Sequence, residues 1–194
     1  MVQPYSDAVY SQMDATDAVW VLTCAGMVFF MQCGFALLES GSVRQKNSTS
    51  ILIKNLFNIC FGCLGFWLLG YGFAFGDVHT FIGLDPRYFA ASGFESLEED
   101  NYLRFVFYAA FALTSSTIVL GALAERTKLV CYLIYSFLHT SILYPIVMAW
   151  TQEGGWLQEA GFHDFAGTAT VFMVGGAAGL SGTWLLGERY GKEK

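Results

Sequence analysis

The sequence predicts an all-α membrane protein with five transmembrane helices. Of its 194 residues, 55% are hydrophobic and only 13% are charged, whereas a soluble domain carries about twice that charged fraction. The charged residues all lie outside five uncharged runs: 18–38, 55–76, 105–124, 129–152 and 165–187. A helix needs about 20 residues to cross the hydrocarbon layer, and each run is that long. The sequence lacks the alternating segments of about 10 residues that a membrane β-barrel requires, so we expect helices.

The first run, 18–38, predicts a helix that anchors the N-terminal end of the chain. The residues before it include Asp7 and Asp14 and contain no basic side chain. A cleavable signal peptide starts with a positively charged region, so we expect the first helix to stay uncleaved.

The second and fifth runs, 55–76 and 165–187, are rich in glycine and predict helices that pack closely against their neighbours. Gly175 and Gly179 stand about one turn apart. Small residues at this spacing let membrane helices approach each other, because lipid tails offer no hydrophobic drive for association. The pattern indicates a bundle and says nothing about a substrate.

The third and fourth runs contain aromatic and ionisable side chains, each of which has two possible roles. In 105–124, Phe107 and Phe111 are about one turn apart on one helix face, where they either stack across a narrow path or simply pack. In 129–152, His139 is a candidate functional group because it is ionisable and lies inside a membrane helix. A neutral, hydrogen-bonded packing role is the favoured interpretation for it.

Lysine and arginine residues predict the orientation of the helices. They concentrate in the links after the first and third runs and after the fifth run, whereas the other loops are mostly acidic. Basic residues favour the cytoplasmic side. We therefore expect an extracellular N-terminal tail (1–17), a membrane domain (18–187) and a cytoplasmic tail (188–194), in the plasma membrane.

The composition also excludes several classes of function. The net charge of −6 comes from the acidic loops and does not suggest a nucleic-acid partner. All five cysteines lie within the runs, so we expect free thiols. The sequence shows neither a metal-ligand spacing inside a run nor a nucleophile with its base. We therefore expect that the protein is not an enzyme and that it binds neither a cofactor nor a metal ion.

Asp164 stands directly before the fifth run and is the most informative acidic residue. A carboxylate at this position accepts hydrogen bonds from the free amides of a helix start and meets the positive end of the helix dipole. On these grounds a cap is favoured over a ligand site. Phe172 lies eight residues further on, which is about 12 Å deeper along a helix and near the middle of the bilayer.

Six stretches follow one another in an order typical of a single family. They are FFMQCGFALLESGSVRQKN (29–47), KNL (54–56), GALAER (121–126), YP (144–145), GGWL (154–157) and DFAG (164–167). Together they resemble the Amt/Mep/Rh ammonium transporters. The resemblance implies a fold of eleven transmembrane helices, in which helices one to five and six to ten form an inverted repeat around a narrow pore, and assembly as trimers. The chain resembles the first repeat, so we expect the native product to continue beyond residue 194.

The resemblance also implies roles for particular residues. Phe107 and Phe111 fall on the phenylalanines of the outer mouth, with Phe111 as the gate, and Asp164 falls on the aspartate that organises the ammonium recruitment site. Two positions depart from the family pattern. Gln152 stands where the vestibule tryptophan is usual, and losing one cation–π contact weakens recruitment by about 0.5–2 kcal/mol. Phe172 stands where the first pore histidine is usual, and a dehydrated solute without a partner there costs a few kcal/mol.

The resulting prediction is transmembrane transport of ammonium or ammonia across the lipid bilayer. The resemblance implies a homotrimer or association with the missing second half. Because of Gln152 and Phe172, an alternative stays open: a non-conducting ammonium sensor, or a partner subunit of the same family.

Overall fold

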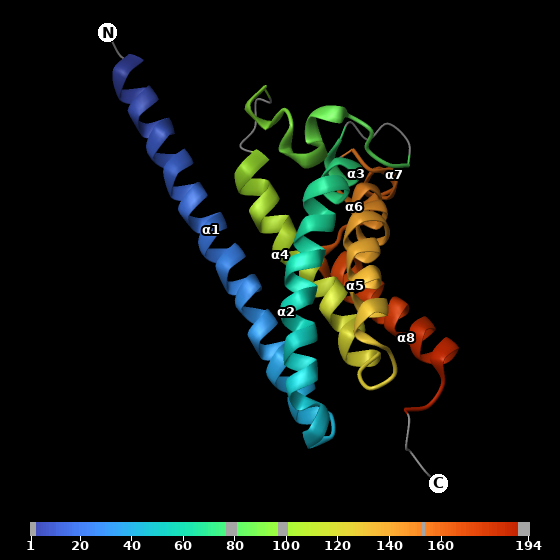
Figure 1. The fold of residues 1–194 in the computed structure, drawn as a ribbon. Helices are drawn as coiled ribbons and strands as arrows, with labels where there is room; N and C mark the ends of the chain where they lie inside the picture. Colours follow the sequence, from blue (N-terminus) through green and yellow to red (C-terminus); the bar gives the residue numbers. More distant parts are fainter. Residues whose placement is uncertain (1–2, 77–80, 97–100, 153, 190–194) are drawn as a thin grey trace.

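A computed structural model describes residues 3–76, 81–96, 101–152 and 154–189, and the regular structure in these ranges is entirely helical (Figure 1). In chain order, with η marking 3-10 and π turns, the segments are α1 (Gln3–Ser42), η1 (Gln45–Asn47), α2 (Ser48–Gly65), η2 (Phe66–Gly70), α3 (Tyr71–Phe75), η3 (Pro86–Ala91), η4 (Phe94–Ser96), α4 (Asn101–Ala122), α5 (Leu129–Leu138), η5 (His139–Leu143), α6 (Tyr144–Thr151), α7 (Trp156–Glu159), η6 (Phe165–Gly167), η7 (Thr168–Met173) and α8 (Val174–Leu186). The predicted all-α fold is confirmed for this part of the chain.

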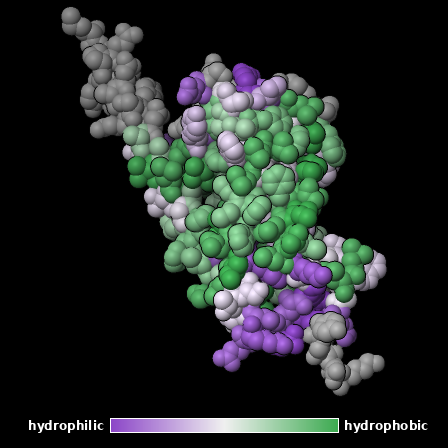
Figure 2. Space-filling model, in the orientation of Figure 1, coloured by the Kyte–Doolittle hydropathy of each residue, from purple (hydrophilic) through white to green (hydrophobic). Residues whose placement is uncertain are grey.

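Within the described residues, five helical stretches are long and apolar enough to cross a membrane, as the sequence predicts. They are Ala15–Ser42, Gln45–Phe75, Asn101–Ala122, Leu129–Glu159 and Phe165–Leu186. Figure 2 shows the corresponding surface, a broad hydrophobic belt between two more hydrophilic ends.

The first helix is longer than the sequence predicts, whereas the last helix ends next to the predicted residue 187. α1 begins at Gln3, well ahead of residue 18, and its upper part stands away from the other helices (Figure 1). α8 ends towards the opposite end of the molecule. Residues 1–2 and 190–194, which belong to the two expected tails, lie outside the described residues.

The fourth span contains a π-helical turn with a cause in the sequence. Pro145 has no N–H to bond the carbonyl of the residue four positions earlier, and its ring crowds that carbonyl. The chain widens into η5 immediately before it. Gly70 of η2 packs directly against the Thr140 carbonyl oxygen, at a distance that no Cβ would tolerate. The two irregular turns therefore meet where only glycine fits.

The predicted close approach of the fifth span is confirmed. Gly175 faces α4, where an added Cβ would lie 2.7 Å from the Ser115 carbonyl oxygen, and at Gly179 it would lie 3.0 Å from the Ala122 Cβ. Gly176, on another face of α8, has nothing within 4 Å of the same added atom. One glycine face thus fixes how closely α8 lies on α4.

Polar side chains join the helices in the middle of the bundle. Gln32 of α1 donates to Thr114 Oγ1 (3.1 Å) and accepts from the Thr117 hydroxyl (2.6 Å), and Asn58 of α2 donates to the same Thr117 oxygen (2.9 Å). Ser136 of α5 donates to Asn58 Oδ1 (2.6 Å). Hydrogen bonds of this kind replace the hydrophobic drive that lipid removes.

Two charged residues, Glu39 and Lys54, are buried inside helices, although they fall between the uncharged runs 18–38 and 55–76. Glu39 is on α1, is 6% exposed and accepts a hydrogen bond of 2.6 Å from Asn55 Nδ2. Lys54 is on α2 and is 7% exposed. The uncharged-run criterion ends a span at the first charge. A helix continues past such a charge when neighbouring segments supply polar partners.

Glu125 organises the lower end of the bundle, between α4 and α5. It accepts hydrogen bonds from the Arg44 backbone N–H (3.2 Å) and from Asn47 Nδ2 (2.6 Å), and it forms ion pairs with Arg44 (3.1 Å) and Arg189 (3.7 Å). Its backbone adopts a left-handed conformation with a φ of 61°. Mainly the Asn47 amide, with the Arg44 donors, lowers the pKa of Glu125 to about 2.

We expect the Glu125 cluster to make stability depend on pH in acid. The pKa falls from 4.5 to about 2 on folding, so the ionised carboxylate stabilises the fold above pH 4.5, and this contribution is lost as the pH falls from 4.5 towards 2. Glu125→Gln should make the melting temperature depend less on pH between 4.5 and 2. The melting temperature is measured by thermal unfolding in detergent. Glu159→Gln, an exposed acid outside the cluster, is the control. Parallel profiles for Glu125→Gln and the unchanged protein would contradict this assignment.

The described residues 81–96, between α3 and α4, pack against the upper end of the bundle. Phe94 of η4 is 3% exposed, and its ring centroid lies 5.1 Å from that of Tyr71. Asp85 caps η3 by accepting from the Arg87 backbone N–H (3.0 Å). Buried aromatic contacts therefore hold this segment over the bundle.

Candidate functional site

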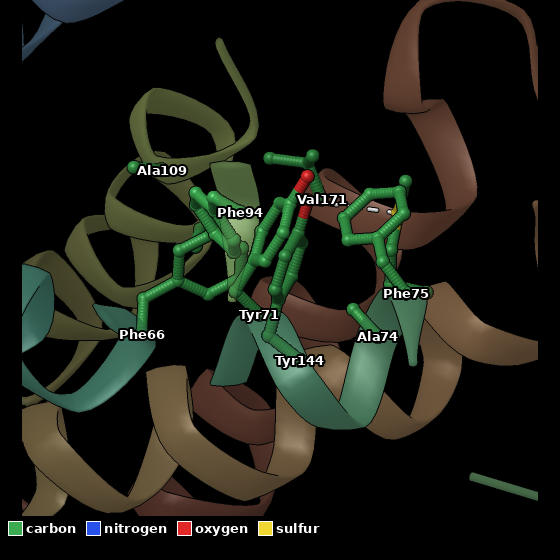
Figure 3. Close-up of a cluster of buried hydrophobic side chains, with 10 residues drawn as sticks. Phe66, Tyr71, Ala74, Phe75, Phe94, Ala109, Tyr144 and Val171 are labelled. Carbon is green, nitrogen blue, oxygen red and sulfur yellow. Dashed lines mark hydrogen bonds between the residues drawn. The ribbon is translucent and has the colours of Figure 1, made fainter. Parts of the chain in front are cut away.

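A cavity of about 870 Å³ opens at the upper end of the bundle, between α4, α6 and the chain that leads into α8. It brings together four of the residues that the sequence analysis selects, namely Phe107, Phe111, Gln152 and Asp164. Figure 3 shows the buried aromatic cluster beside it, in which Tyr71, Phe66 and Tyr144 converge. Tyr144 and Val171 belong both to this cluster and to the cavity lining. The hydrophobic core thus forms one side of the cavity.

Phe107 and Phe111 form an aromatic pair on the α4 side of the cavity. Their ring centroids lie 5.0 Å apart at 66°, and Phe107 also contacts Tyr108 at 5.4 Å. Edge-to-face pairs at this spacing are favourable. Both rings remain partly exposed to the cavity. They present aromatic surface of the kind that attracts a cation.

Asp164 lines the cavity and caps the fifth span. Its Oδ1 accepts from the Ala169 N–H (3.0 Å), and its Oδ2 accepts from the Thr170 N–H (2.8 Å) and the Thr170 hydroxyl (2.7 Å). Burial acts to raise the pKa of Asp164, but these hydrogen bonds outweigh it and hold the pKa below its ordinary value. The carboxylate is therefore ionised near pH 7.

The cap differs in position from the expected one. The sequence places the helix start at residue 165, whereas residues 165–167 form the 3-10 turn η6, with a left-handed backbone at Ala166 (φ 60°) and Gly167 (φ 77°). The continuous helical segment begins at Thr168. Asp164 reaches across this turn to the amides of η7, which explains why it can cap the span and face the cavity at once.

Gln152 ends α6 and lines the cavity. Its side-chain Nε2 donates to the carbonyl oxygen of Ala74 on α3. Its Oε1 is buried and has no donor among the described residues. Trp150, two residues earlier, points elsewhere: its indole N–H donates to the Phe81 carbonyl oxygen (3.0 Å). The position therefore offers an amide to the cavity in place of an indole ring.

Phe172 and His139 do not belong to the cavity lining. Phe172 is 44% exposed on η7. His139 is fully buried in η5, where Nε2 lies 2.9 Å from Ser115 Oγ and Nδ1 lies 2.8 Å from the Tyr135 hydroxyl oxygen. Both ring nitrogens thus have partners, which agrees with the packing role favoured for His139.

Sequence reasoning missed other residues of the cavity. Thr170, which donates twice to Asp164, lines the cavity, and so does Arg104, whose guanidinium lies 5.1 Å from the Phe75 ring centroid. Gln158, Phe162 and His163, which precede Asp164 in the chain, also line the cavity. Thr170 is recognisable as a hydroxyl within reach of a capping carboxylate. That Arg104 and His163 line the same cavity depends on tertiary contacts that sequence spacing does not encode.

The fold and the site define a helical membrane protein with five candidate spans. At the upper end of its bundle is a cavity lined by aromatic rings and by the carboxylate of Asp164. Residues 19–194 match the model of the Ammonium Transporter Family. The chain belongs to this family.

Relatives of known sequence cover the same region. The chain is 40% identical to Ammonium transporter 3 of Dictyostelium discoideum, over 96% of this chain and 42% of that protein. It is also 40% identical to Ammonium transporter 1 member 3 of Solanum lycopersicum, over 94% of this chain and 41% of that protein. The chain therefore spans less than half the length of these relatives.

Solved structures show the same fold. A Sensor Amt Protein superimposes with a TM-score of 0.85 at 34% identity, covering 91% of this chain and 45% of that chain. Candida albicans Mep2 superimposes with a TM-score of 0.76 at 27% identity, covering 89% and 39%. These matches support the prediction that the five helices correspond to one part of a larger transporter fold.

Proposed function

We propose that the chain forms the first half of an ammonium-conducting path and that the upper cavity recruits the ion. The observation that carries the proposal is the convergence of Phe107, Phe111, Gln152 and Asp164 on one cavity of about 870 Å³. An aromatic wall attracts a cation, and the ionised carboxylate of Asp164 in the lining adds a favourable field. Membership of the ammonium transporter family supports the same substrate.

Asp164 acts in this proposal by organising the site and by its charge. Both carboxylate oxygens accept hydrogen bonds from Ala169 and Thr170, so the carboxylate holds the start of η7 in place beside the cavity. The ammonium ion meets its electrostatic field without displacing these donors. Gln152 Oε1, which lacks a donor within the described chain, would accept from an N–H of the ion or of its hydration water and offset part of the lost cation–π contact.

The arrangement in the membrane is part of the proposal. The cavity end faces the outside, the Glu125 end faces the cytoplasm, and the protein resides in the plasma membrane. The second half of the pore comes from a following repeat or from a partner, and the assembly is a homotrimer. Transport requires no cofactor and involves no enzymatic step.

Growth complementation tests the proposal directly. Cells that lack ammonium uptake are supplied with the native gene product and grown on low ammonium, with an authentic transporter of the family as the positive control. Growth comparable to that control supports transport. Failure to grow, with the protein present in the membrane, would overturn it.

A non-conducting sensor or partner subunit is the second candidate. Two observations favour it: Phe172 offers an apolar ring on the fifth span, and the Gln152 amide is already bonded to Ala74. A Sensor Amt Protein is among the structures that resemble the chain. Ammonium binding by the purified protein without flux in liposomes would establish this function and exclude transport.

Phe172→His is expected to raise ammonium flux if position 172 lines the conducting path. A histidine restores a hydrogen-bonding group for a dehydrated solute, and removing a penalty of a few kcal/mol predicts at least about a tenfold gain. Phe172 is 44% exposed within this chain, so the change should leave the described core intact. Flux is measured in liposomes containing the purified protein.

Met173→His is the matched control for this experiment. Met173 is the next residue and is 65% exposed, and it points to a different side of the helix. Unchanged flux in Phe172→His, or an equal gain in Met173→His, would show that position 172 does not line the path.

A further inference from the structure

Lys54 is a buried cation near the lower end of the bundle. It is 7% exposed on α2, its Nζ donates one hydrogen bond of 3.1 Å to the Thr127 carbonyl oxygen, and it lies 5.2 Å from the ring centroid of Tyr132. Among the described residues, no carboxylate forms a salt bridge with it within 4.0 Å. An ammonium group has three donors, and a charge removed from water without a counter-ion is costly.

A cavity of about 300 Å³ lies beside Lys54, between the start of α2 and the segment that joins α4 to α5. Its lining includes Lys54, Arg126, Thr127 and Lys128. Arg126 Nε and Thr127 Oγ1 are buried and have no hydrogen-bond partner within the described chain. The cavity therefore gathers two polar atoms that lack a partner within the described chain, together with the Lys54 ammonium, which makes one of the three hydrogen bonds it can donate.

The start of α2 adds a favourable field for an anion. Asn47 precedes this helix, but its side chain makes no cap and donates to Glu125 Oε1 instead (2.6 Å). Ser50 and Ile51, in the first turn, both line the cavity. A helix start carries partial positive charge, and here it lies next to Lys54 and Lys128.

Glu125 does not neutralise this charge. It borders the same cavity, but its Oε1 accepts from Arg44 and Asn47, and its Oε2 forms the ion pair with Arg189. Its charge is therefore balanced by Arg44 and Arg189, which lie outside the lining. The lining keeps a surplus of positive charge from Lys54, Arg126 and Lys128.

We propose that this cavity binds a phosphate group. Its volume corresponds to roughly ten water molecules, which is ample for a phosphate with some of its hydration. Phosphate supplies several acceptor oxygens to the lysine, arginine and hydroxyl donors at once. Exposed Leu52 and Ile53 on α2 and Val130 on α5 flank the site, so the phosphate belongs either to the head group of an anionic phospholipid or to a free anion.

Thermal unfolding of the purified chain tests both sources. In one arm, the chain in a neutral detergent is titrated with sodium phosphate, while sodium chloride keeps the ionic strength constant. In the other arm, the chain is placed in phosphatidylcholine membranes with or without phosphatidic acid. Binding to the folded state raises the melting temperature. A shift with inorganic phosphate supports a free-anion site, and a shift only with phosphatidic acid supports a lipid site.

Lys54→Met is the decisive variant. It should melt at a higher temperature than the unchanged protein without phosphate, because an uncompensated buried charge is removed. It should also bind phosphate at least about tenfold more weakly, the effect of losing one charge-assisted hydrogen bond. Lys46→Met, an exposed lysine on η1 outside the cavity, is the matched control and should keep the full response.

Lys128→Gln guards against a folding defect in the first variant. Lys128 is exposed and lines the cavity, so its replacement should leave the fold intact and weaken phosphate binding about two- to fivefold. A response that is equal in Lys46→Met and Lys54→Met would overturn the proposal, because it would reflect general screening. The absence of any shift with both phosphate and phosphatidic acid would also overturn it.

Discussion

Asp164→Ala is expected to destabilise the protein and to abolish most ammonium uptake. The change removes the acceptor for the Ala169 and Thr170 amides and for the Thr170 hydroxyl. Thr170 is 5% exposed, so water cannot easily take over its bonds. A loss of about 2–4 kcal/mol in unfolding free energy follows from leaving such donors without a charged acceptor. Uptake should fall at least about tenfold, because the cavity loses both the carboxylate charge and the hydrogen bonds that hold the start of η7.

Two further variants separate these effects. Asp164→Asn keeps the size of the side chain and one acceptor oxygen, so we expect a smaller loss of stability but a similar loss of recruitment. Asp85→Asn alters another capping carboxylate, which lies outside the cavity, and should leave uptake unchanged. Melting temperature and uptake are measured on the same preparations. If Asp164→Ala lowers the melting temperature and uptake persists, Asp164 is a cap without a role in recruitment.

Gly175→Ala is expected to displace α8 from α4. The new methyl carbon would lie 2.7 Å from the Ser115 carbonyl oxygen and 3.1 Å from the Ile118 Cβ. Ser115 contributes backbone, which cannot rotate out of the way, so the helices must separate. Overpacking of this kind costs about 1–3 kcal/mol. Because α8 continues from the segment that Asp164 caps, the shift should also reduce uptake.

Gly176→Ala is the control for the second prediction. The neighbouring glycine has nothing within 4 Å of an added Cβ, and alanine is the better helix former. We expect its melting temperature to equal or exceed that of the unchanged protein, whereas Gly175→Ala melts earlier. Equal melting temperatures for the two variants would show that α4 and α8 do not meet as closely as described.

Much of the fold is predictable from the sequence because a membrane imposes a simple rule. A spanning helix must be long, apolar and free of exposed charge, so the uncharged runs locate the five spans confirmed here. The glycines of the fifth span predict close packing, because small residues let membrane helices approach each other. Glu39 and Lys54 mark the limit of the rule, since both are buried inside helices by partners that come from elsewhere in the chain.

The candidate site can be predicted only in part from the sequence. The phenylalanine pair of α4 and Asp164 stand out by spacing and by position, and family resemblance assigns them roles. That they share one cavity depends on how α4, α6 and the start of the fifth span meet. The role of Gln152 could not be predicted from the sequence, because its side chain bonds Ala74, a residue far away in the chain.

The sequence by itself determined the five membrane helices, the glycine face of α8 and the family to which the chain belongs, since each depends on local composition or on residues in a fixed order. Only the tertiary structure decided that Asp164 caps η7 from across a 3-10 turn, that both nitrogens of His139 have partners, and that Lys54 is buried beside unpaired donors. The physical reason is the same in each case. A polar group in a membrane bundle must find a partner, and the partner is chosen by the packing of helices that the linear order of residues does not specify.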